Sequence, residues 1–341
     1  MTIRCWRTLV RRARVAVVLL ALIVGATRAA ADTIVVSNYR FSATAMPYAV
    51  ALEQGLFKAS GADVDRVVGA EGSGAIRAMA ELKAAYAEVS PAAVVDAASS
   101  GADIRIIGGN VPSVAEYVWI ARASSPVNSV DDLRGRRLAY TNANSTSEIL
   151  DRLWIERAGL SPKDVVLSKV GGLVAGPTFL EVNGIDVALV AEPLWSTLPA
   201  ESYKVVGSPG AELPPVMNLI AVTTSDAARD KRDFIRGVIA ARRKAIQYIH
   251  EQTEDAARVI AKVYAMDPAV VERVLRRLLA SEQATGKLYW ADGKPDADAM
   301  DRAMSREPLA VSRATKTGWR SLVDPTFMSS SLASTQDSRA R

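Results

Sequence analysis

The sequence predicts an α/β protein built from two similar units, each with a largely parallel sheet. Short apolar runs alternate with amphipathic stretches, which is typical of successive strand and helix units. The alternation occurs twice, and 341 residues, 49% of them hydrophobic, suffice for two lobes. After about residue 226 it gives way to helical periodicity, so we expect the second unit to be followed by a helical region.

The first unit begins with an apolar run at 33–37, which predicts a buried strand. A helix is predicted at 45–61, because Pro47 stands near its start and Gly61 follows its end. The remaining predicted elements of this unit are a strand at 64–69, a helix at 74–83, a strand at 85–90, a helix at 92–99 and a strand at 104–109. This order and spacing favour a largely parallel sheet.

The second unit repeats the pattern. Its predicted elements are a strand at 117–122, a short helix at 129–135, strands at 136–141, 165–170 and 186–191, helices at 145–160 and 177–184, and an apolar strand at 217–224. Ser129 is the expected N-cap of the short helix, and Gly135 closes it. Pro and Gly gather at 108–117 and 208–218, where we expect the chain to cross between the two units.

The predicted helices at 226–284 carry apolar stripes and many Arg and Glu residues. We interpret these charges as solvent-facing, because long charged side chains are rarely buried. The last residues, 329–341, are small and polar, which predicts a disordered tail.

The first 31 residues read as a cleavable signal peptide. Basic residues precede an apolar stretch too short to span a membrane, and Ala29 and Ala31 occupy the A-x-A positions. We expect cleavage after Ala31 and export to a bacterial periplasm. The net charge is +5, but this segment holds six Arg and no acid, so the rest carries about −1. The body therefore has no electrostatic footprint for nucleic acid.

The composition argues against most catalytic sites. Cys5 is the only cysteine and lies in the leader, so disulfides, thiol nucleophiles and Cys-ligated metals are excluded from the mature chain. His250 is the only histidine and lies in the helical region, where we expect a structural or exposed role. A Ser-His-Asp triad and a His-rich zinc site are therefore disfavoured. We expect no catalytic residue, no metal and no cofactor.

Ligands of such sheets bind at the loops that follow the carboxyl ends of strands. The candidate ligand-binding residues in these loops are Asn38, Tyr39, Met46, Gly72, Ser73, Ser90, Asn110, Asn142, Asn144, Ser145, Thr146, Gly172, Glu192 and Trp195. Each has an ordinary alternative: a polar loop at 38–48, a tight turn at 69–76, a helix start at Ser90 and a core position for Trp195. Glu71 in the second loop would oppose an anion bound close by.

The tract from Asn142 to Ser147 is the most polar of these loops. Ser145 and Glu148 have the S-x-x-E spacing of a capping box, which begins a helix. A cap accounts for one or two of these polar side chains. We therefore expect the tract both to cap the helix and to supply Asn142, Asn144 and Thr146 to a ligand.

Four segments resemble one protein family. They are YAVALEQGLFKASGADV (48–64), GADIRIIGG (101–109), VNSVDDLRGRRLAYTNANS (127–145) and FLEVNGIDVALVAEP (179–193). The chain looks like a periplasmic solute-binding protein of an ABC importer, of the branch that binds nitrate, sulfonates, taurine and thiamine-pyrimidine precursors. The resemblance covers about residues 33–325. Where that family has Gly-Ser, this chain has Asn144-Ser145.

The resemblance implies a type II periplasmic binding fold, with a mixed, mostly parallel sheet in each lobe and the ligand in the cleft between them. Lobe 1 would comprise 32–112 and 216–328, and lobe 2 would comprise 113–215. A monomer would capture a small solute and deliver it to the ABC permease and ATPase subunits at the inner membrane. The ligand would be a sulfonate, nitrate or another small organic anion, or else a heteroaromatic such as a pyrimidine. An enzyme resembling the thiamine-pyrimidine synthase and a periplasmic sensor are the alternatives.

Overall fold

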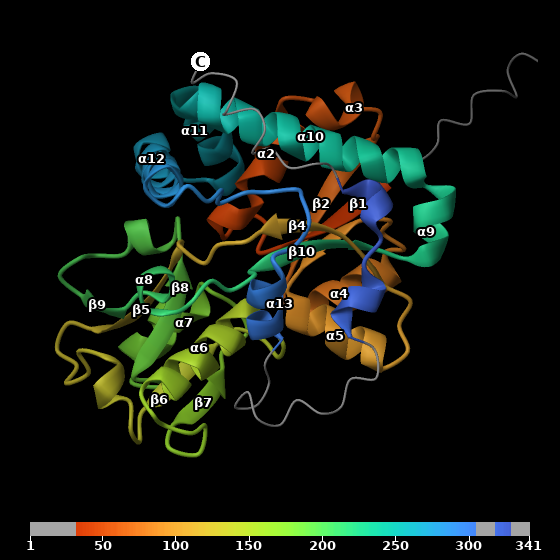
Figure 1. Cartoon of the computed structure of the whole chain (residues 1–341). Coiled ribbons are helices and arrows are strands. Elements are labelled where there is room, and N and C mark those ends of the chain that lie inside the picture. Colours follow the sequence, from red (N-terminus) through yellow and green to blue (C-terminus); the bar gives the residue numbers. More distant parts are fainter. Residues whose placement is uncertain (1–31, 305–317, 329–341) are drawn as a thin grey trace, which may run out of the picture. The chain divides into compact units, whose positions relative to one another are not determined.

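The structure is a computed structural model that describes residues 32–304 and 318–328 (Figure 1). The predicted signal peptide (1–31) and the predicted disordered tail (329–341) lie outside the described residues. Among the described helices, none has the length and apolar character needed to cross a membrane.

Ten strands form two five-stranded sheets. The strands are β1 (Asp32–Ser37), β2 (Val64–Ala70), β3 (Ala87–Val89), β4 (Arg105–Val111), β5 (Tyr117–Arg122), β6 (Arg137–Tyr140), β7 (Val166–Lys169), β8 (Val187–Ala191), β9 (Tyr203–Gly207) and β10 (Leu219–Thr223). The first sheet has the order β2-β1-β3-β10-β4, and the second has the order β7-β6-β8-β5-β9. Each sheet contains one strand antiparallel to both neighbours, β10 in the first and β5 in the second.

The antiparallel strands mark where the chain changes sheets. The chain leaves the first sheet after Val111 and enters the second at Tyr117, and it returns between Gly207 and Leu219. Both passages fall in the Pro- and Gly-containing segments predicted as crossings. The fold class is thereby confirmed as two mixed sheets flanked by helices. The exact lobe boundaries stay a prediction.

The helices cover the sheets and form the helical region. The α-helices are α2 (Met46–Glu53), α3 (Leu56–Ala59), α4 (Ser73–Glu81), α5 (Pro91–Ser99), α6 (Thr146–Arg157), α7 (Ala175–Glu181), α8 (Pro209–Glu212), α9 (Ser225–Asp230), α10 (Arg232–Glu251), α11 (Thr253–Tyr264), α12 (Pro268–Thr285) and α13 (Ala297–Ala303). Short 3₁₀ helices are η1 (Ala43–Ala45), η2 (Val130–Asp132), η3 (Trp195–Thr197), η4 (Trp319–Leu322) and η5 (Pro325–Phe327).

Helices pack on both faces of the first sheet, which explains the continuous apolar run of β1. Ile34 and Val36 face the cluster that contains α2 and α10. Val35, between them, faces the cluster that contains α4 and α5. Figure 1 shows α10 on one side of β1 and β2, with α4 and α5 on the other. A strand buried on both faces needs apolar side chains at every position.

The structure differs from the predicted elements at three points. The apolar strand predicted at 217–224 within the second unit is β10, which pairs with β3 and β4 of the first sheet. The helix predicted at 45–61 is interrupted, because Gly55 has a left-handed backbone conformation (φ +64°) between α2 and α3. The strand β9 was not predicted, although Pro209 and Gly210 follow it, because its continuous apolar run is only Val205 and Val206. The predicted cap of Ser129 on the short helix is present, in a complete capping box with Asp132.

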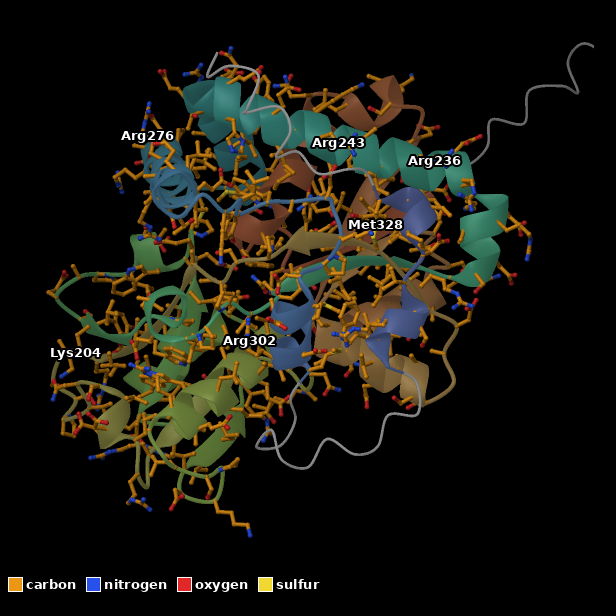
Figure 2. All side chains as sticks on the ribbon, in the orientation of Figure 1. Lys204, Arg236, Arg243, Arg276, Arg302 and Met328 are labelled. Carbon is orange, nitrogen blue, oxygen red and sulfur yellow. The ribbon has the colours of Figure 1, made fainter. Side chains whose placement is uncertain are left out.

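The charged faces of the helical region follow the prediction except at Arg242 and Glu282, which are buried. Arg236 on α10 and Arg276 on α12 are exposed (Figure 2). Arg242 is instead buried, with 2% of its side chain exposed, and its guanidinium lies 3.5 Å from the Glu88 carboxylate of β3. A buried charge of this kind requires such a partner. Arg242 therefore links α10 to β3 of the first sheet through this buried ion pair.

The hydrogen bonds of His250 are expected to stabilise the folded protein in a pH-dependent way. Its Nε2 lies 2.7 Å from Glu282, and its Nδ1 lies 2.9 Å from the Ile246 carbonyl. Burial lowers the pKa of His250, but these hydrogen bonds outweigh it and raise the pKa above the usual 6.5. Since the folded-state pKa is the higher one, the stabilisation is fully present below about pH 6.5 and is lost as the pH rises through the folded-state pKa.

The measurement is urea unfolding of the wild type and His250→Gln between pH 5 and 9. We expect the variant to lose about 1 kcal/mol of unfolding free energy at low pH and much less at high pH. If the unfolding free energies of the two proteins differed by the same amount at every pH, this role of His250 would be contradicted.

Candidate functional site

Loops from both sheets enclose one small polar cavity of about 10 Å³. A volume of that size holds roughly one water molecule. The residues lining it are Ser37, Asn38, Glu71, Gly72, Ser90, Tyr117, Thr141, Ser145, Thr146, Ser147, Leu173 and Leu219. Most of these side chains carry hydroxyl, amide or carboxyl groups, so the cavity is suited to hydrogen-bonding a small polar molecule.

Sheet topology explains why these residues meet. Asn38, Glu71 and Ser90 follow the carboxyl ends of the parallel strands β1, β2 and β3. Thr141 and Leu173 follow β6 and β7 in the second sheet in the same way. Loops at the carboxyl ends of parallel strands share one edge of a sheet. The two sheets present these edges to the same cavity.

The polar tract that precedes α6 folds as a cap. Ser145 is the N-cap, and its Oγ accepts a hydrogen bond from the Glu148 N–H at 3.3 Å. The Glu148 carboxylate accepts from the N–H of Asn144 at 2.7 Å, one residue earlier than in a standard capping box. The backbone of Asn144, which donates this displaced hydrogen bond, is left-handed, with φ +60°.

Hydroxyl groups form a chain along the second-sheet side of the cavity. The Oγ of Ser147 lies 3.0 Å from Thr141 Oγ1 and 2.8 Å from Ser145 Oγ. It also accepts a hydrogen bond from the backbone N–H of Thr141 at 2.9 Å. Each hydroxyl is thereby oriented by its neighbours, which fixes the polar lining before any solute arrives.

Hydrogen bonds in and beside the cavity wall link the two sheets. Ser90 Oγ donates to the Asn144 carbonyl at 2.6 Å. The Asn144 side-chain amide donates to Ser73 Oγ and to Asp96, both at 3.1 Å. Thr146 Oγ1 donates to the Asn218 carbonyl at 3.1 Å, next to β10. The tract therefore holds the two sheets together at this edge.

Gly72 permits the closest approach between the sheets. A Cβ atom at this position would lie 2.5 Å from the carbonyl oxygen of Ala143. The backbone at Gly72 also has φ +51° and ψ −133°, a conformation that side chains disfavour. Glycine is therefore required here if the cavity is to close.

The cavity carries one acidic side chain. Burial raises the pKa of the Glu71 carboxyl, and hydrogen bonds with Thr141 and Asn142 oppose this shift. Burial and the carboxyls of Glu116 and Glu71 raise the pKa of the Tyr117 hydroxyl. Among the described residues that line the cavity, none is Lys, Arg or His. The described residues also contain no group of three or more His, Cys, Asp or Glu placed to hold a metal ion.

The structure brings five of the residues predicted from the sequence to the cavity wall: Asn38, Gly72, Ser90, Ser145 and Thr146. Three more lie beside it. Asn144 and Ser73 bond to each other next to the lining residues Gly72 and Ser145, and the amide of Asn142 donates to the Gly171 carbonyl at 3.1 Å.

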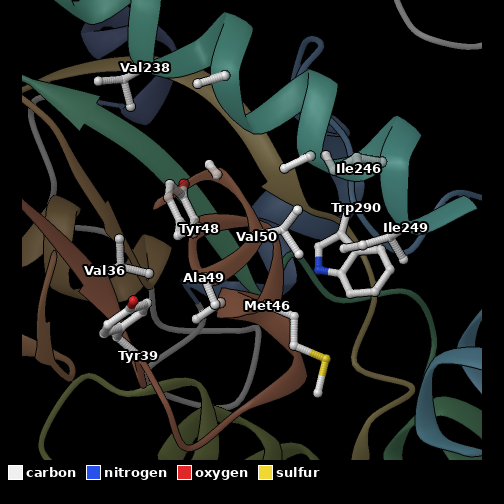
Figure 3. Packing of buried hydrophobic residues seen from close by; sticks show 14 of the residues in the cluster. Val36, Tyr39, Met46, Tyr48, Ala49, Val50, Val238, Ile246, Ile249 and Trp290 are labelled. Carbon is white, nitrogen blue, oxygen red and sulfur yellow. The ribbon is translucent and has the colours of Figure 1, made fainter. Parts of the chain in front are cut away.

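The other predicted residues lie away from the cavity wall. Tyr39 and Met46 pack in the hydrophobic core beneath α10 (Figure 3). Asn110 is buried and donates to Glu88 at 2.6 Å, in the polar network that also receives Arg242. Its position at the end of β4 resembled a ligand loop, but β4 is the outer strand of the first sheet.

Three further predicted residues lie outside the lining. Glu192 is fully buried, pairs with Arg277 of α12 and accepts a hydrogen bond from the Ser196 N–H. Trp195 begins η3 and packs against the core of the second sheet. Gly172 is half-buried, and its neighbour Leu173 faces the cavity instead.

Sequence reasoning missed several lining residues. These are Ser37, Glu71, Tyr117, Thr141, Ser147, Leu173 and Leu219. Ser147 is the last residue of the polar tract from Asn142 to Ser147, and Thr141 directly precedes that tract, so including the whole tract and one residue before it would have identified both. Glu71 was set aside because its charge opposes an anion. Nothing local distinguishes Tyr117 or Leu219, because strand pairing alone brings them to the cavity.

Comparison with known proteins shows what the chain is similar to. A protein of Escherichia coli (strain K12) named for binding aliphatic sulfonates is 23% identical over 206 residues. The match covers 57% of this chain and 64% of that relative, less than two thirds of its length.

Two solved structures share the fold. The periplasmic aliphatic sulphonate binding protein SsuA from Escherichia coli has a TM-score of 0.64 at 16% identity, covering 80% of this chain and 85% of that one. The alkanesulfonate-binding protein SsuA from Xanthomonas axonopodis pv. citri, bound to MOPS, has a TM-score of 0.66 at 17% identity, covering 82% and 91%. Identities this low establish the fold alone.

A family model described as "NMT1/THI5 like" matches residues 42–256, more than half of the chain. The matched region contains most of the residues that line the cavity, from Glu71 to Leu219, whereas Ser37 and Asn38 precede it. The chain therefore belongs to the NMT1/THI5-like family.

Proposed function

We propose that this chain is the extracytoplasmic solute-binding component of an ABC importer. It captures one small solute between its two sheets and delivers it to the permease and ATPase subunits at the inner membrane. The observation that carries the proposal is the cavity lined by polar side chains from both sheets, with hydrogen bonds that link the sheets across it.

The small size of the cavity indicates how such a protein would work. About 10 Å³ admits a water molecule but no organic solute. A solute can therefore enter only when the sheets move apart, and it would be enclosed when they return. Hinge closure of two lobes around a ligand is an established mode of motion. The two chain crossings, after Val111 and after Gly207, are the segments able to act as the hinge.

The comparisons support the same proposal. The similar proteins named above bind aliphatic sulfonates or alkanesulfonates according to their names. Periplasmic location after cleavage of the predicted signal peptide fits a protein of this class. We propose that the mature protein is monomeric and not an enzyme.

An enzyme on the same fold is the competing function, because the family name covers more than binding proteins. The histidine chemistry expected of a thiamine-pyrimidine synthase has little support here. His250, the only histidine of the chain, bonds to Glu282 on α12 and does not line the cavity.

The test is a thermal-shift screen of the mature protein against sulfonates, nitrate, carboxylates, amines, pyrimidines and aromatic acids, followed by calorimetry. A solute that binds the folded state raises the melting temperature by mass action. We expect binding of one solute per chain, with no conversion of that solute on prolonged incubation. Conversion by the protein alone would support the enzyme, and no binding across the screen would contradict the proposal.

Removing the hydrogen bonds of Ser90 and Asn144 that link the two sheets beside the cavity should weaken solute binding. The change is the double variant Ser90→Ala and Asn144→Gly, where glycine preserves the left-handed backbone. It deletes the bonds of Ser90 to the Asn144 carbonyl and of Asn144 to Ser73 and Asp96. At about 1 kcal/mol each, the affinity should fall about 100-fold, as measured by calorimetry.

Asn183→Gly is the matched control, because Asn183 is also left-handed (φ +53°) and lies in the second unit away from the cavity. It should bind solute as the wild type does. Equal affinities for the double variant and the wild type would show that these bonds do not contribute to capture.

A further inference from the structure

The cavity lining offers two hydrogen-bond acceptors to a solute. One is the Glu71 carboxyl, which already bonds to Thr141 and Asn142. Asn38 contributes its side-chain oxygen Oδ1, which is buried and has no hydrogen-bond partner among the described residues. Buried polar atoms of this kind are rare in native proteins and call for an explanation. A ligand that donates hydrogen bonds would satisfy Asn38 Oδ1, and a positive charge on that ligand would pair with the Glu71 carboxyl.

Four donors in or beside the cavity are already engaged with protein acceptors. Ser90 Oγ donates to the Asn144 carbonyl, and Thr146 Oγ1 donates to the Asn218 carbonyl. At the start of α4, where a helix would attract an anion, the Ser73 N–H bonds to the Ala143 carbonyl at 3.3 Å. The Gly74 N–H bonds to the Glu71 carbonyl at 2.9 Å. These groups are therefore not available to hold a sulfonate or a nitrate.

The charges of the residues that line the cavity also disfavour an anionic solute. The described residues lining the cavity include one carboxyl group, on Glu71, and no cationic side chain. An enclosed anion would lie beside this carboxyl without a compensating charge, which is strongly unfavourable in a dehydrated site. A cation would instead pair with the carboxyl and offset its desolvation.

We propose that the captured solute is a small organic cation with N–H donors, an ammonium or amidinium group, held by the Glu71 carboxylate and Asn38 Oδ1. This inference rests on the proposed solute-binding function and specifies its ligand. Leu173, Leu219 and the ring of Tyr117 supply apolar contact for the carbon part of the solute. The burial that raises the pKa of Glu71 is the same burial that a bound cation would offset.

The experiment compares ions of matched shape and opposite charge on the mature protein by calorimetry. The pairs are guanidinium and nitrate, acetamidinium and acetate, and propylammonium and propanesulfonate, each at up to millimolar concentration. We expect the cation of at least one pair to bind at least tenfold more tightly than its anion, and no anion to bind more tightly than its cation. Preference for the anion in any pair, or failure of every cation to bind, overturns the inference.

Variants of one glutamate test the role assigned to it. Glu71→Gln removes the charge at nearly constant volume and should weaken cation binding at least tenfold without weakening anion binding. Glu71→Asp keeps the charge and should retain the preference for cations. Glu81→Gln is the control, because it removes the same charge from the exposed end of α4. Equal losses for Glu71→Gln and Glu81→Gln would overturn the role of Glu71.

The experiment distinguishes failure of the proposed cationic ligand from failure of the proposed solute-binding function. If an anion binds at one per chain and the cations do not, the inference fails and the solute-binding function stands. If no solute of either charge binds in this experiment or in the wider screen, the proposed function fails as well.

Discussion

Replacing Gly72 by Ala is expected to weaken solute binding by about 100-fold while the protein stays folded. The added Cβ would lie 2.5 Å from the Ala143 carbonyl oxygen, so the two sheets could not approach as they do here. Separation would break the bonds of Ser90 to Asn144 and of Ser73 to both Asn144 and Ala143. Three bonds at about 1 kcal/mol each correspond to roughly two orders of magnitude in affinity.

The variant should also be slightly less stable without solute. The positive φ of Gly72 is disfavoured for Ala, at a cost of about 1–3 kcal/mol, which is a fraction of the stability of an ordinary domain. Circular dichroism melting of the unliganded protein measures this loss separately from calorimetry of binding.

Gly74→Ala is the matched control for this prediction. A Cβ at Gly74 would meet only the flexible end of the Arg77 side chain, at 3.8 Å. This variant should bind solute as tightly as the wild type. Wild-type affinity in Gly72→Ala would show that binding does not require the approach of the sheets at Ala143.

Replacing Glu116 by Gln is expected to raise the unfolding free energy at pH 7 by about 3 kcal/mol. Glu116 precedes β5 at the first chain crossing and is fully buried. Burial raises the pKa of its carboxyl from 4.5 to about 8, although hydrogen bonds to it act in the opposite direction. Each pKa unit between the unfolded-state value and pH 7 corresponds to about 1.4 kcal/mol.

The sign of this effect depends on pH. A carboxyl with a raised folded-state pKa does not destabilise the protein below its unfolded-state pKa of 4.5, and its cost grows as the pH rises toward about 8. The advantage of Gln should therefore vanish near pH 4 and be largest above pH 7. Gln keeps the acceptor for the Asn218 amide, which donates to Glu116 at 2.6 Å.

Urea unfolding of the wild type and Glu116→Gln from pH 4 to 8 measures the effect. Glu201→Gln, which removes an exposed charge between η3 and β9, serves as the control and should change stability little at any pH. A stability difference between Glu116→Gln and the wild type that does not vary with pH would contradict the buried, protonated state inferred for Glu116.

Local signals in the sequence were sufficient for most of the fold. The apolar run of β1, the cap at Ser129 and the start of α6 at Ser145 all depend on neighbours within a few residues. The interruption at Gly55 was missed because a single glycine inside an apolar helical pattern can be tolerated in a continuous helix. Gly55 directly follows Gln54, the C-cap of α2, where a left-handed glycine commonly ends a helix.

The candidate site was only partly predictable for the same reason. Sequence indicates which loops follow strands, and so it identified Asn38, Ser90 and Thr146. It does not indicate which side chain of a loop turns toward the cavity, and Tyr39, the neighbour of Asn38, turns into the core. The pair of Glu88 and Arg242 joins positions far apart in the chain, and only the tertiary structure reveals it.

The claim that one solute is enclosed between the two sheets is tested most directly by small-angle X-ray scattering during a titration. The mature wild type and Gly72→Ala are each titrated with the solute that the thermal-shift screen identifies. We predict that the radius of gyration of the wild type falls and reaches its minimum at one solute per chain, while that of Gly72→Ala stays unchanged. An unchanged radius of gyration in the wild type at saturation would contradict enclosure of the solute by closing of the sheets.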